Sequence, residues 1–596
     1  MNDGIYSLNQ LFKGYRIFSI PGYQRNYAWE DKHLEDFYND LFYIDNEKEY
    51  FMGTILLRET GEKRKKSFWE FEIYEVIDGQ QRLTTVCIFI KSAIEILKSK
   101  KEKEPNLEKQ IKKLKEHYIE EEGFLKLELL GEDNQFFKNY IIEGQEYPDE
   151  TITPSQRRLK RAKQFFKEKL ANLSISEIEN LISKLGKTRV LVYTVKEKGD
   201  AMLMFETIND RGKLLSNLEK TKSFLMYLVY MSHKNAKLLE NIEEKFGKIY
   251  RYIEEITEKY NEEYNKDVKE DDIQRYHWVL WFDGDYKGSF RYIDKLKTHF
   301  RNLMSKNKNE LLNKVKNYVE SLEQVFYAFK EIFVDKINEF NELKYIVYLG
   351  RVGNFYPLII STWIKIKKEN EKDKEIKREF TKILEAIEKF IFRVFLIGNK
   401  RSDTGISSLY NLAHEIFKGE KSINDALKEI KDSAMSYVPQ RDLINELNNE
   451  NFYNRHSSQD IRYIFYQYEL KLREEEGEPL SISLKEILSE KYTIEHILAQ
   501  GLSKEHRPED LKDDKEFENY VHRLGNLVLC SKSWNSSMGN KPFEEKKKCK
   551  SKEYSCYQKS IFKCQQKLAE FETFSKNEID KRQQELIEWM KEKWEF

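Results

Sequence analysis

The sequence predicts an α+β protein that is predominantly helical. Pro and Gly number only 9 and 24 among 596 residues, charged residues make up 35% of the chain, and apolar residues recur at helical spacing over long stretches. Scarce Pro and Gly combined with many Leu, Ile, Lys and Glu favour long helices over a disordered chain. At about 100–200 residues per domain, the chain is long enough for two to four domains with their own cores.

Charge and hydropathy exclude several classes of protein. Lys plus Arg number 103, as do Asp plus Glu, so the formal net charge is zero. This balance argues against a basic or acidic tail but leaves room for a local basic groove. No stretch approaches the ~18 continuous apolar residues of a membrane span, and the first residues are not a signal peptide. The five cysteines fit a reducing compartment, so we expect a cytoplasmic protein without a membrane partner.

The first hundred residues predict mixed α and β structure. Residues 51–57 and 68–77 are strand candidates, and we place the basic residues 63–66 in the loop that connects them. The second strand runs into Asp78-Gly79-Gln80-Gln81-Arg82. Apolar residues then recur at helical spacing, so a helix is predicted to begin at or just after Gln81.

Most of the remaining chain is predicted to be helical. Residues 100–185 combine many Lys and Glu with helical apolar spacing, residues 190–193 are a further strand candidate, and residues 213–475 are almost continuously helical. A Gly-Glu-Pro sequence at 477–479 separates this region from a compact end piece. We therefore divide the chain into residues 1–225, 226–480 and 481–596.

The end piece carries an acid next to a histidine, Glu495 and His496, at the end of a short apolar run. Asn526 follows in the sequence Arg-Leu-Gly-Asn-Leu-Val-Leu, and Asn535 comes nine residues later. Hydrolysis of a phosphodiester with one metal ion needs a base, oxygen ligands for a divalent cation and a group that orients the base. An imidazole can take a proton at neutral pH, and carboxylate and amide oxygens are donors that Mg²⁺ prefers. Three more residues complete the pattern: Asn540, Phe543 and Lys546.

This arrangement resembles the HNH, or ββα-metal, nuclease finger. The resemblance implies that His496 is the general base, that Glu495 and Asn535 hold the metal, and that Asn526 braces a loop and orients the histidine. We therefore count His496, Asn526 and Asn535 as catalytic. The Pro that usually follows the acid–histidine pair is replaced by the run Ile-Leu-Ala-Gln at 497–500. The alternative is that His496 makes its hydrogen bonds inside a helical domain that has no catalytic activity.

Several neighbouring residues allow more than one interpretation. Residues 541–552 include six Lys and two Glu, which can hold phosphates or form a solvated helix face. The positions of His506 and His522 along the chain give no reason to include them in the site. The four C-terminal cysteines lack the close C-x2-C pairs of zinc ribbons, so scattered thiols on helices are favoured over structural zinc. These cysteines are Cys530, Cys549, Cys556 and Cys564.

Three polar clusters stand out in the N-terminal part, at residues 20–29, 78–82 and 205–212. A Gly-containing turn that opens a helix offers backbone N–H groups and a helix dipole to phosphate. Arg25 and Arg82 can neutralise phosphate oxygens, and the carboxylate at position 78 can hold Mg²⁺ or position water. No G-x4-GK-[ST] sequence occurs, so a P-loop enzyme is excluded.

These clusters resemble the ParB/sulfiredoxin-like nucleotide-handling domain of GmrSD-type, modification-dependent (type IV) restriction enzymes. The resemblance implies nucleotide hydrolysis at Asp78 and Arg82. Glu219 stands where the family often has Asp. The structural alternative is that Asp78 and Arg82 form an internal ion pair that closes the turn. The residues implied in nucleotide binding are Gln24, Arg25, Tyr27, Asp78, Gly79, Gln80, Gln81, Arg82, Asn209 and Arg211.

Together, the two ends predict a nucleotide-regulated, metal-dependent DNA endonuclease in anti-phage defence that cleaves or nicks modified foreign DNA. The expected partners are double-stranded, modified phage DNA and a nucleoside triphosphate, with Mg²⁺ or another divalent cation as cofactor; homo-oligomers are left open. Coupling between nucleotide and nuclease sites is an inference from their presence on one chain. The alternatives are a ParB-like, nucleotide-switched DNA-binding protein with an inactive finger, and a nicking enzyme that senses a backbone modification.

Overall fold

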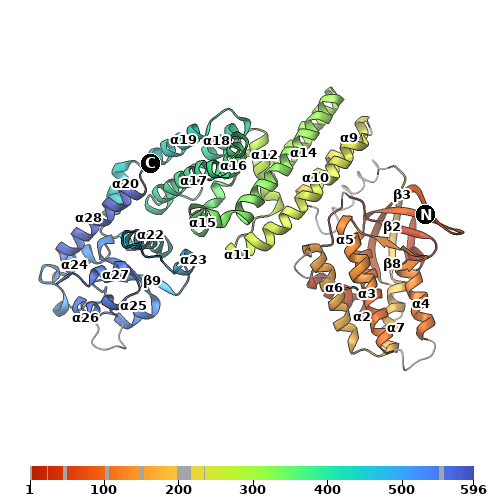
Figure 1. Cartoon of the computed structure of the whole chain (residues 1–596), viewed down its shortest axis with the longest axis horizontal. Helices are drawn as coiled ribbons and strands as arrows, with labels where there is room; N and C mark the ends of the chain where they lie inside the picture. Colours follow the sequence, from red (N-terminus) through yellow and green to blue (C-terminus); the bar gives the residue numbers. More distant parts are fainter. Residues whose placement is uncertain are drawn as a thin grey trace. The chain divides into compact units, whose positions relative to one another are not determined.

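The computed structural model forms two compact units, drawn in Figure 1. One unit comprises Met1–Glu262, Asp267–Gln274 and Arg291–Lys330, and the other comprises Glu263–Lys266, Arg275–Phe290 and Glu331–Phe596. The boundary between the units lies in the predicted helical middle, and the three-part division stays a prediction. Asn209 and Arg211 lie outside the described residues, which are 3–22, 24–43, 50–100, 107–146, 153–197, 200, 216–233, 235–548 and 556–596.

The first unit contains a six-stranded mixed sheet in the order β1-β8-β3-β4-β2-β7. β1 pairs with β8, and β3 with β4, in antiparallel fashion, whereas the other neighbours are parallel. A separate short hairpin joins β5 and β6. The strands are β1 (Gly4–Ser7), β2 (Arg16–Ser19), β3 (Phe51–Lys66), β4 (Trp69–Asp78), β5 (Glu120–Glu121), β6 (Phe124–Leu125), β7 (Leu127–Glu128) and β8 (Arg189–Val195).

Helices make up the rest of this unit. Among the described residues, four of its helices begin with a capping box, in which a Ser or Thr and the residue three positions later satisfy each other's backbone N–H groups. The helices are α1 (Leu8–Phe12), α2 (Asp31–Tyr43), α3 (Gln80–Ser99), α4 (Leu107–Tyr118), α5 (Gly131–Phe136), the π-helix η2 (Phe137–Glu143), α6 (Pro154–Ala171), α7 (Ile175–Lys187), α9 (Asn217–His233), α10 (Ala236–Glu255), the π-helix η5 (Ile256–Asn261), α13 (Tyr292–Lys306) and α14 (Lys308–Lys330).

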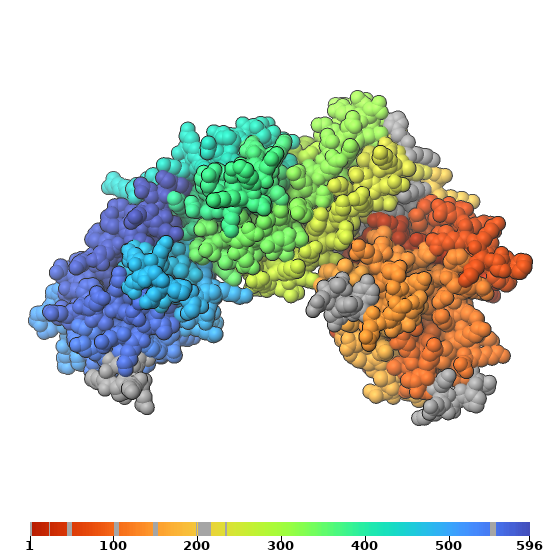
Figure 2. Space-filling view, in the orientation of Figure 1, coloured from red at the N-terminus to blue at the C-terminus, as the bar shows by residue number. Residues whose placement is uncertain are grey.

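The two faces of β4 belong to different cores. Phe71 and Ile73 join a small cluster with Ile17, whereas Tyr74 and Val76 lie in the large core that also contains residues of α2, α3, α4, α6 and α7. This follows from the two-residue period of a strand. Helices therefore cover one face of the sheet, as the ribbon in Figure 1 shows. The same residues form the red-to-orange part of the space-filling view in Figure 2.

The predicted strand–turn–helix sequence is confirmed, with shifted boundaries. The helix α3 begins at Gln80, one residue earlier than predicted, and β8 covers the strand predicted at 190–193. The prediction for residues 63–66 was wrong: they belong to β3, paired with β4 up to Lys66 opposite Trp69. Cross-strand pairing thus holds four basic residues in an extended ladder where their charge suggested a loop.

The second unit is a stack of helices followed by a small strand pair. Two short helices, α11 (Glu262–Tyr264) and α12 (Glu270–Trp281), contribute to both units, as does the 3-10 turn η6 (Gly288–Arg291). The helices before the strand pair are η7 (Glu331–Asp335), η8 (Ile337–Glu339), α15 (Asn341–Tyr348), η9 (Val352–Asn354), α16 (Tyr356–Glu369), α17 (Asp373–Phe390), η10 (Ile391–Ile397), α18 (Ile406–Lys418), α19 (Ile423–Tyr437), α20 (Gln440–Leu447), α21 (Phe452–Arg455), α22 (Ser458–Glu476) and α23 (Leu484–Ile487).

The C-terminal part pairs β9 (Tyr492–His496) antiparallel with β10 (Leu527–Ser531), with His496 opposite Leu527. The helix α25 (Lys532–Met538) follows β10 directly, capped by the Ser531 hydroxyl, which accepts from the N–H of Trp534. The remaining elements are η11 (Lys504–His506), η12 (Glu509–Leu511), α24 (Asp514–Val521), η13 (Leu524–Asn526), α26 (Phe543–Lys547), η14 (Tyr557–Lys559), α27 (Lys563–Leu568) and α28 (Lys576–Lys593).

The cysteines only partly match the expectation of scattered thiols on helices. Cys87 on α3, Cys530 on β10 and Cys564 on α27 are free, buried thiols, whereas Cys556 is disulfide-bonded. Cys549 lies outside the described residues. In the part of the chain that the structure describes, no helix is long and apolar enough to cross a membrane.

Candidate functional site

The N-terminal turn is closed by an ion pair. Asp78 is the last residue of β4, and Gly79 turns the chain into α3 with a φ of 98°. The Arg82 guanidinium donates to Asp78 Oδ2 at 2.9 Å and to the carbonyl of Met52 at 2.9 Å. The internal ion pair that formed the structural alternative is therefore present. Both side chains keep about a fifth of their surface exposed, 23% for Asp78 and 22% for Arg82.

One glycine makes room for this guanidinium, and a second forms the turn beside it. A Cβ at Gly53 would lie 2.4 Å from Arg82 Nη1, and one at Gly79 would lie 3.0 Å from Ile55 Cγ1 and 3.6 Å from Arg82 Nη2. Both glycines also have φ near +100°, a conformation that other residues rarely adopt. Gly53 is thus required by the packing of the arginine, whereas the Gly of the turn is required by its backbone conformation and by its contact with Ile55.

The paired glutamines of the turn hold the first polar cluster by its backbone. Gln80 Nε2 donates to the carbonyl of Arg25 at 3.0 Å. Gln81 accepts from the N–H of Ala28 at 2.8 Å and donates to the carbonyl of Asn26 at 3.1 Å. These side chains use their amide groups to position residues 25–28, which is a structural task.

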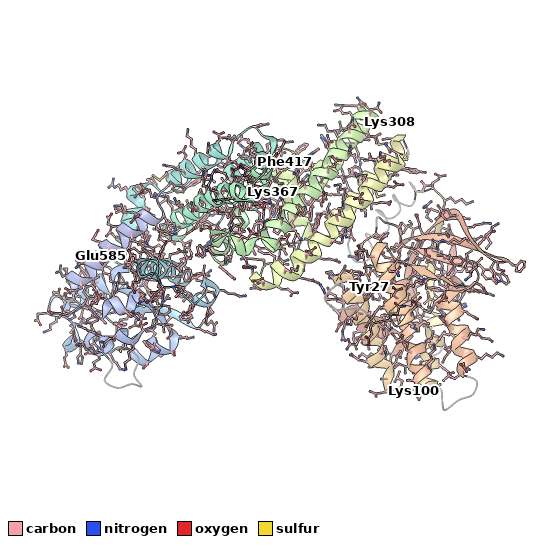
Figure 3. The ribbon with its side chains drawn as sticks, in the orientation of Figure 1. Tyr27, Lys100, Lys308, Lys367, Phe417 and Glu585 are labelled. Carbon is pink, nitrogen blue, oxygen red and sulfur yellow. The ribbon has the colours of Figure 1, made fainter. Side chains whose placement is uncertain are left out.

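Gln24 and Tyr27 are also engaged inside the protein. Gln24 is buried and donates through Nε2 to the carbonyl of Ile77 at 2.5 Å. Tyr27, labelled in Figure 3, is buried with its hydroxyl 2.8 Å from the hydroxyl of Thr85. Burial raises the pKa of Tyr27 well above its ordinary value, so its hydroxyl stays protonated. Neither side chain presents a surface to a ligand in this arrangement.

Arg25 differs from its neighbours because its guanidinium is partly exposed and makes one long ion pair. Its side chain is 31% exposed, and Nε lies 3.6 Å from Glu219 Oε1 on α9. Lys222, one turn further along α9, is buried and donates to the carbonyl of Gly22 at 3.0 Å. Burial lowers the pKa of Lys222 to about 7. The structure therefore adds two residues of α9 to the site: Glu219, noted in the sequence only as a departure from the family, and Lys222.

In the C-terminal unit, Glu495 is paired with a lysine that lies 51 residues further along the chain. Lys546 is fully buried and donates to Glu495 Oε1 at 2.5 Å, to the carbonyl of His496 at 2.8 Å and to that of Ile497 at 3.3 Å. Burial raises the pKa of Glu495 and lowers that of Lys546. The carboxylate expected to hold a metal instead anchors an ammonium group beneath the end of β9.

His496 lies in a buried aromatic environment. Its ring centroid is 4.5 Å from that of Tyr453 and 5.4 Å from that of His522, both edge-on. The side-chain nitrogen of Gln500 lies 3.0 Å from its Nδ1. Burial, with smaller contributions from His522 and Lys546, lowers the pKa of His496 to about 3. The imidazole is therefore neutral at physiological pH, and the burial that keeps it neutral also makes it a weaker base than a solvated histidine.

His522 lies in the site although nothing in its spacing along the chain selected it. Its ring lies beside those of His496 and Tyr453, with Nδ1 buried and without a hydrogen-bond partner. Burial lowers the pKa of His522 as well. Its position just before the Arg-Leu-Gly-Asn sequence was the only available signal.

Asn526 braces the loop that follows β9. Its side chain accepts from the N–H of Leu498 at 2.8 Å and donates to the carbonyls of Leu498 at 3.0 Å and Val521 at 2.8 Å. Its own carbonyl accepts from the N–H of Ile497 at 2.9 Å. Asn526 is completely buried, so these contacts make it a positioning residue and leave no surface for substrate.

The neighbouring glycine of this sequence is required by packing. A Cβ at Gly525 would lie 2.2 Å from the carbonyl oxygen of Ile579 and 3.0 Å from Gln583 Cβ, both on α28. The guanidinium of Arg582 donates to the Gly525 carbonyl at 2.6 Å. The Leu-Gly-Asn turn thus fits closely against the last helix of the chain.

Asn535 lies on α25, which packs against both β9 and β10, and its side chain is partly exposed. Its amide oxygen remains a suitable donor for a divalent cation. Glu495 does not fit an open metal ligand, because its carboxylate is buried against Lys546. Among the described residues, no group of three or more His, Cys, Asp or Glu side chains is placed to hold a metal ion.

Two lysines in the basic run at 541–552 match neither of its two interpretations. Lys546 and Lys547 are buried, and Lys547 donates to the carbonyl of Phe571. Lys548 is exposed, and residues 549–555 lie outside the described residues. Two of these lysines therefore stabilise the fold and are not available to phosphate.

Comparison with protein families assigns the chain to a class. Residues 8–226 match the model described as GmrSD restriction endonuclease, N-terminal domain, and residues 437–589 match that described as GmrSD restriction endonucleases, C-terminal domain. The chain thus carries both terminal domains of a restriction endonuclease. It belongs to the GmrSD restriction endonuclease family. No curated protein matches the chain.

Proposed function

We propose that the chain is a nucleotide-regulated DNA endonuclease whose C-terminal unit hydrolyses phosphodiester bonds through His496. The observation that carries this proposal is the neutral imidazole at the end of β9, in a strand pair followed directly by α25 with Asn535. Two antiparallel strands and a helix are the elements that an HNH finger requires. Membership of the GmrSD family supports DNA as the substrate.

The chemistry follows from the state of His496. A neutral imidazole can take the proton of a water molecule as that water attacks phosphorus. Contacts with Tyr453, His522 and Gln500 fix the orientation of the ring. Lys546 holds the carbonyls of His496 and Ile497, and Asn526 holds the backbone of Leu498, so the segment that follows the base is rigid.

A divalent cation remains part of the proposal, as Mg²⁺ or another ion. When bound, it would supply Lewis-acid stabilisation of the phosphate. Asn535 is the predicted ligand that fits, and Glu495 is reassigned to the support of Lys546. Chelation with EDTA is expected to stop cleavage and added Mg²⁺ or Mn²⁺ to restore it; unchanged cleavage in EDTA would remove the metal from the proposal.

For the N-terminal unit we propose nucleoside triphosphate binding at the turn between β4 and α3. Gln24, Gln80, Gln81 and Tyr27 position the backbone, while Asp78, Arg82 and the partly exposed Arg25 remain for phosphate contact and hydrolysis. The N-terminal family match supports this assignment only at the level of a restriction endonuclease domain. The roles of Asn209 and Arg211 stay predictions.

Substitution of two arginines separates ligand contact from fold support. Arg25→Ala is expected to weaken nucleotide binding at least tenfold without changing the melting temperature, because its surface ion pair contributes little to stability. Arg82→Ala is expected to lose binding and also about 1.5–3 kcal/mol of stability, because it removes charged hydrogen bonds to Asp78 and Met52. Isothermal titration and thermal melting measure both effects; full nucleotide affinity in Arg25→Ala would exclude that residue from the site.

Cleavage of DNA by the purified chain tests the proposal as a whole. Plasmid and phage DNA, with and without base or backbone modifications, are incubated with each nucleoside triphosphate and Mg²⁺. We expect nicked or linear products from modified DNA. Equal cleavage of all substrates would contradict modification dependence, and no cleavage under any condition would contradict the nuclease assignment.

The second candidate is a ParB-like, nucleotide-switched DNA-binding protein with an inactive finger. The engagement of Glu495 by Lys546 favours it, because a decayed metal site can keep such a structural ion pair. The neutral imidazole of His496 and the nearby amide oxygen of Asn535 favour the enzyme. Nucleotide-dependent DNA binding without any cleavage would select the second candidate.

A further inference from the structure

The β3–β4 hairpin ends in an exposed tip, residues 62–70, which the proposed sites do not use. The ladder continues to Lys66 opposite Trp69, so only Ser67 and Phe68 form the turn, with Ser67 at a φ of 54°. The side chain of Phe68 is 96% exposed, the highest value among the described large hydrophobic residues. Phe68 therefore contributes almost nothing to the core, and its ring is available to a partner.

The tip is also basic. Its nine residues include four basic side chains and only two acidic ones, Glu62 and Glu70. The basic residues are Lys63, Arg64, Lys65 and Lys66. Lys63 and Lys65 both pair with Glu70, at 2.8 and 3.2 Å, and Arg64 pairs with Glu128. Lys65 nevertheless keeps 76% of its side chain exposed. Surface ion pairs of this kind contribute little to stability, so phosphates can replace their carboxylates at little cost.

The base of the tip is stiffened by aromatic packing. Trp69 stacks on Tyr15 with ring centroids 4.6 Å apart and planes at 25°, and Phe71 meets Tyr15 edge-on. In the ladder, Lys66 is opposite Trp69 and Arg64 is opposite Phe71, so these cations share the aromatic face. A rigid two-stranded ribbon thus carries one apolar side chain at its end and cations along both faces.

We propose that this tip binds duplex DNA, with Lys63, Lys65 and Lys66 on phosphates and Phe68 inserted between base pairs from the minor groove. β-Ribbons enter DNA grooves, and apolar wedges that unstack a base step are a known way of bending the duplex. The inference rests on the proposed function in taking DNA as the partner. It adds a contact surface in the first unit that neither family match assigns.

The test measures binding of a fluorescein-labelled duplex by the full chain carrying His496→Ala, which prevents cleavage from complicating the titration. Phe68→Ser is expected to lower affinity about tenfold without changing the salt dependence. The double variant Lys65→Ala with Lys66→Ala is expected to reduce the slope of log affinity against log salt by about 2. Tyr43→Ser serves as the control, because Tyr43 is 77% exposed in the same unit but outside the hairpin.

A second readout identifies the wedge. A duplex containing 2-aminopurine should brighten when bound by the parent chain but not when bound by Phe68→Ser. Affinity and brightening of Phe68→Ser equal to those of Tyr43→Ser would overturn the inference. So would binding to anionic phosphatidylglycerol vesicles that is lost in Phe68→Ser while duplex binding stays intact, because it would assign the tip to a membrane surface.

The inference and the proposed function fail separately. Tip-dependent binding together with no cleavage by the unmodified chain keeps the DNA contact and rejects the nuclease. Cleavage by the unmodified chain with binding that ignores both tip variants keeps the nuclease and rejects the contact.

Discussion

Replacement of Lys546 by alanine is expected to destabilise the C-terminal unit by about 3–5 kcal/mol, the cost of breaking a buried ion pair by removing one partner. Lys546 is fully buried and donates to the Glu495 carboxylate and to the carbonyls of His496 and Ile497. Its loss leaves a buried charge and two carbonyls without their donor. Urea denaturation of the full chain, followed by tryptophan fluorescence, measures the change.

Lys548→Ala is the matched control, because Lys548 belongs to the same basic run but is exposed. Its substitution is expected to change stability by no more than about 0.5 kcal/mol. The double variant Glu495→Gln with Lys546→Met should recover much of the loss, since it leaves no unpaired charge. Equal stability of Lys546→Ala and Lys548→Ala would show that the lysine does not support the loop of His496.

Local pattern was sufficient to predict the elements around the N-terminal turn. The two-residue period of residues 68–77 and the helical spacing after Gln81 each depend on neighbours within a few positions, and both were recovered as β4 and α3. The role of Gly79 could be predicted in the same way, because it stands between a strand and a helix, where the chain must turn.

Side-chain pairing across the fold could not be predicted in this way. Glu495 looked like a metal ligand because a carboxylate beside a histidine has that chemistry, but its partner Lys546 lies 51 residues away. Lys546 belongs to the pattern of residues that begins at Asn535, but this spacing does not show whether its side chain faces the solvent or the core. Burial, which decides between these roles, depends on contacts that only the folded chain defines.

The same limit explains the assignments at the first polar cluster. Glutamine, arginine and aspartate can contact phosphate or hold backbone with the same atoms. In the structure, Gln80 and Gln81 hold residues 25–28, and Arg82 closes the turn on Asp78. The partial exposure of Asp78, Arg82 and Arg25 distinguishes the side chains that can reach a ligand from the buried ones that only support the turn.

Replacement of His496 by alanine is expected to reduce DNA cleavage by about 10²–10⁴-fold, the usual contribution of a general base. Because the pKa of His496 is lowered to about 3, the base is unprotonated throughout the neutral range. In a plot of cleavage rate against pH, the decline on the acid side should therefore lie below the usual histidine pKa near 6.5. The same shift has a consequence for stability. Between those two values the unfolded chain binds more protons than the folded one, so stability falls as pH falls through this window.

His506→Ala is the control for this substitution, since His506 is an exposed histidine of the same unit that the site does not use. Nucleotide affinity should be the same in both variants, and each should keep a single cooperative thermal transition. The melting temperature of His496→Ala should be the lower of the two, because its buried ring is lost. Nucleotide binding that fell in His496→Ala would point to unfolding and not to the missing base.

The most direct test of the account is single-turnover cleavage of a modified duplex by the unmodified chain, His496→Ala and His506→Ala at pH 7.5 with Mg²⁺. The account predicts that the unmodified chain and His506→Ala cut at the same rate and that His496→Ala leaves the duplex intact over the same time. Cleavage by His496→Ala at the rate of the unmodified chain would contradict the claim that this imidazole activates water.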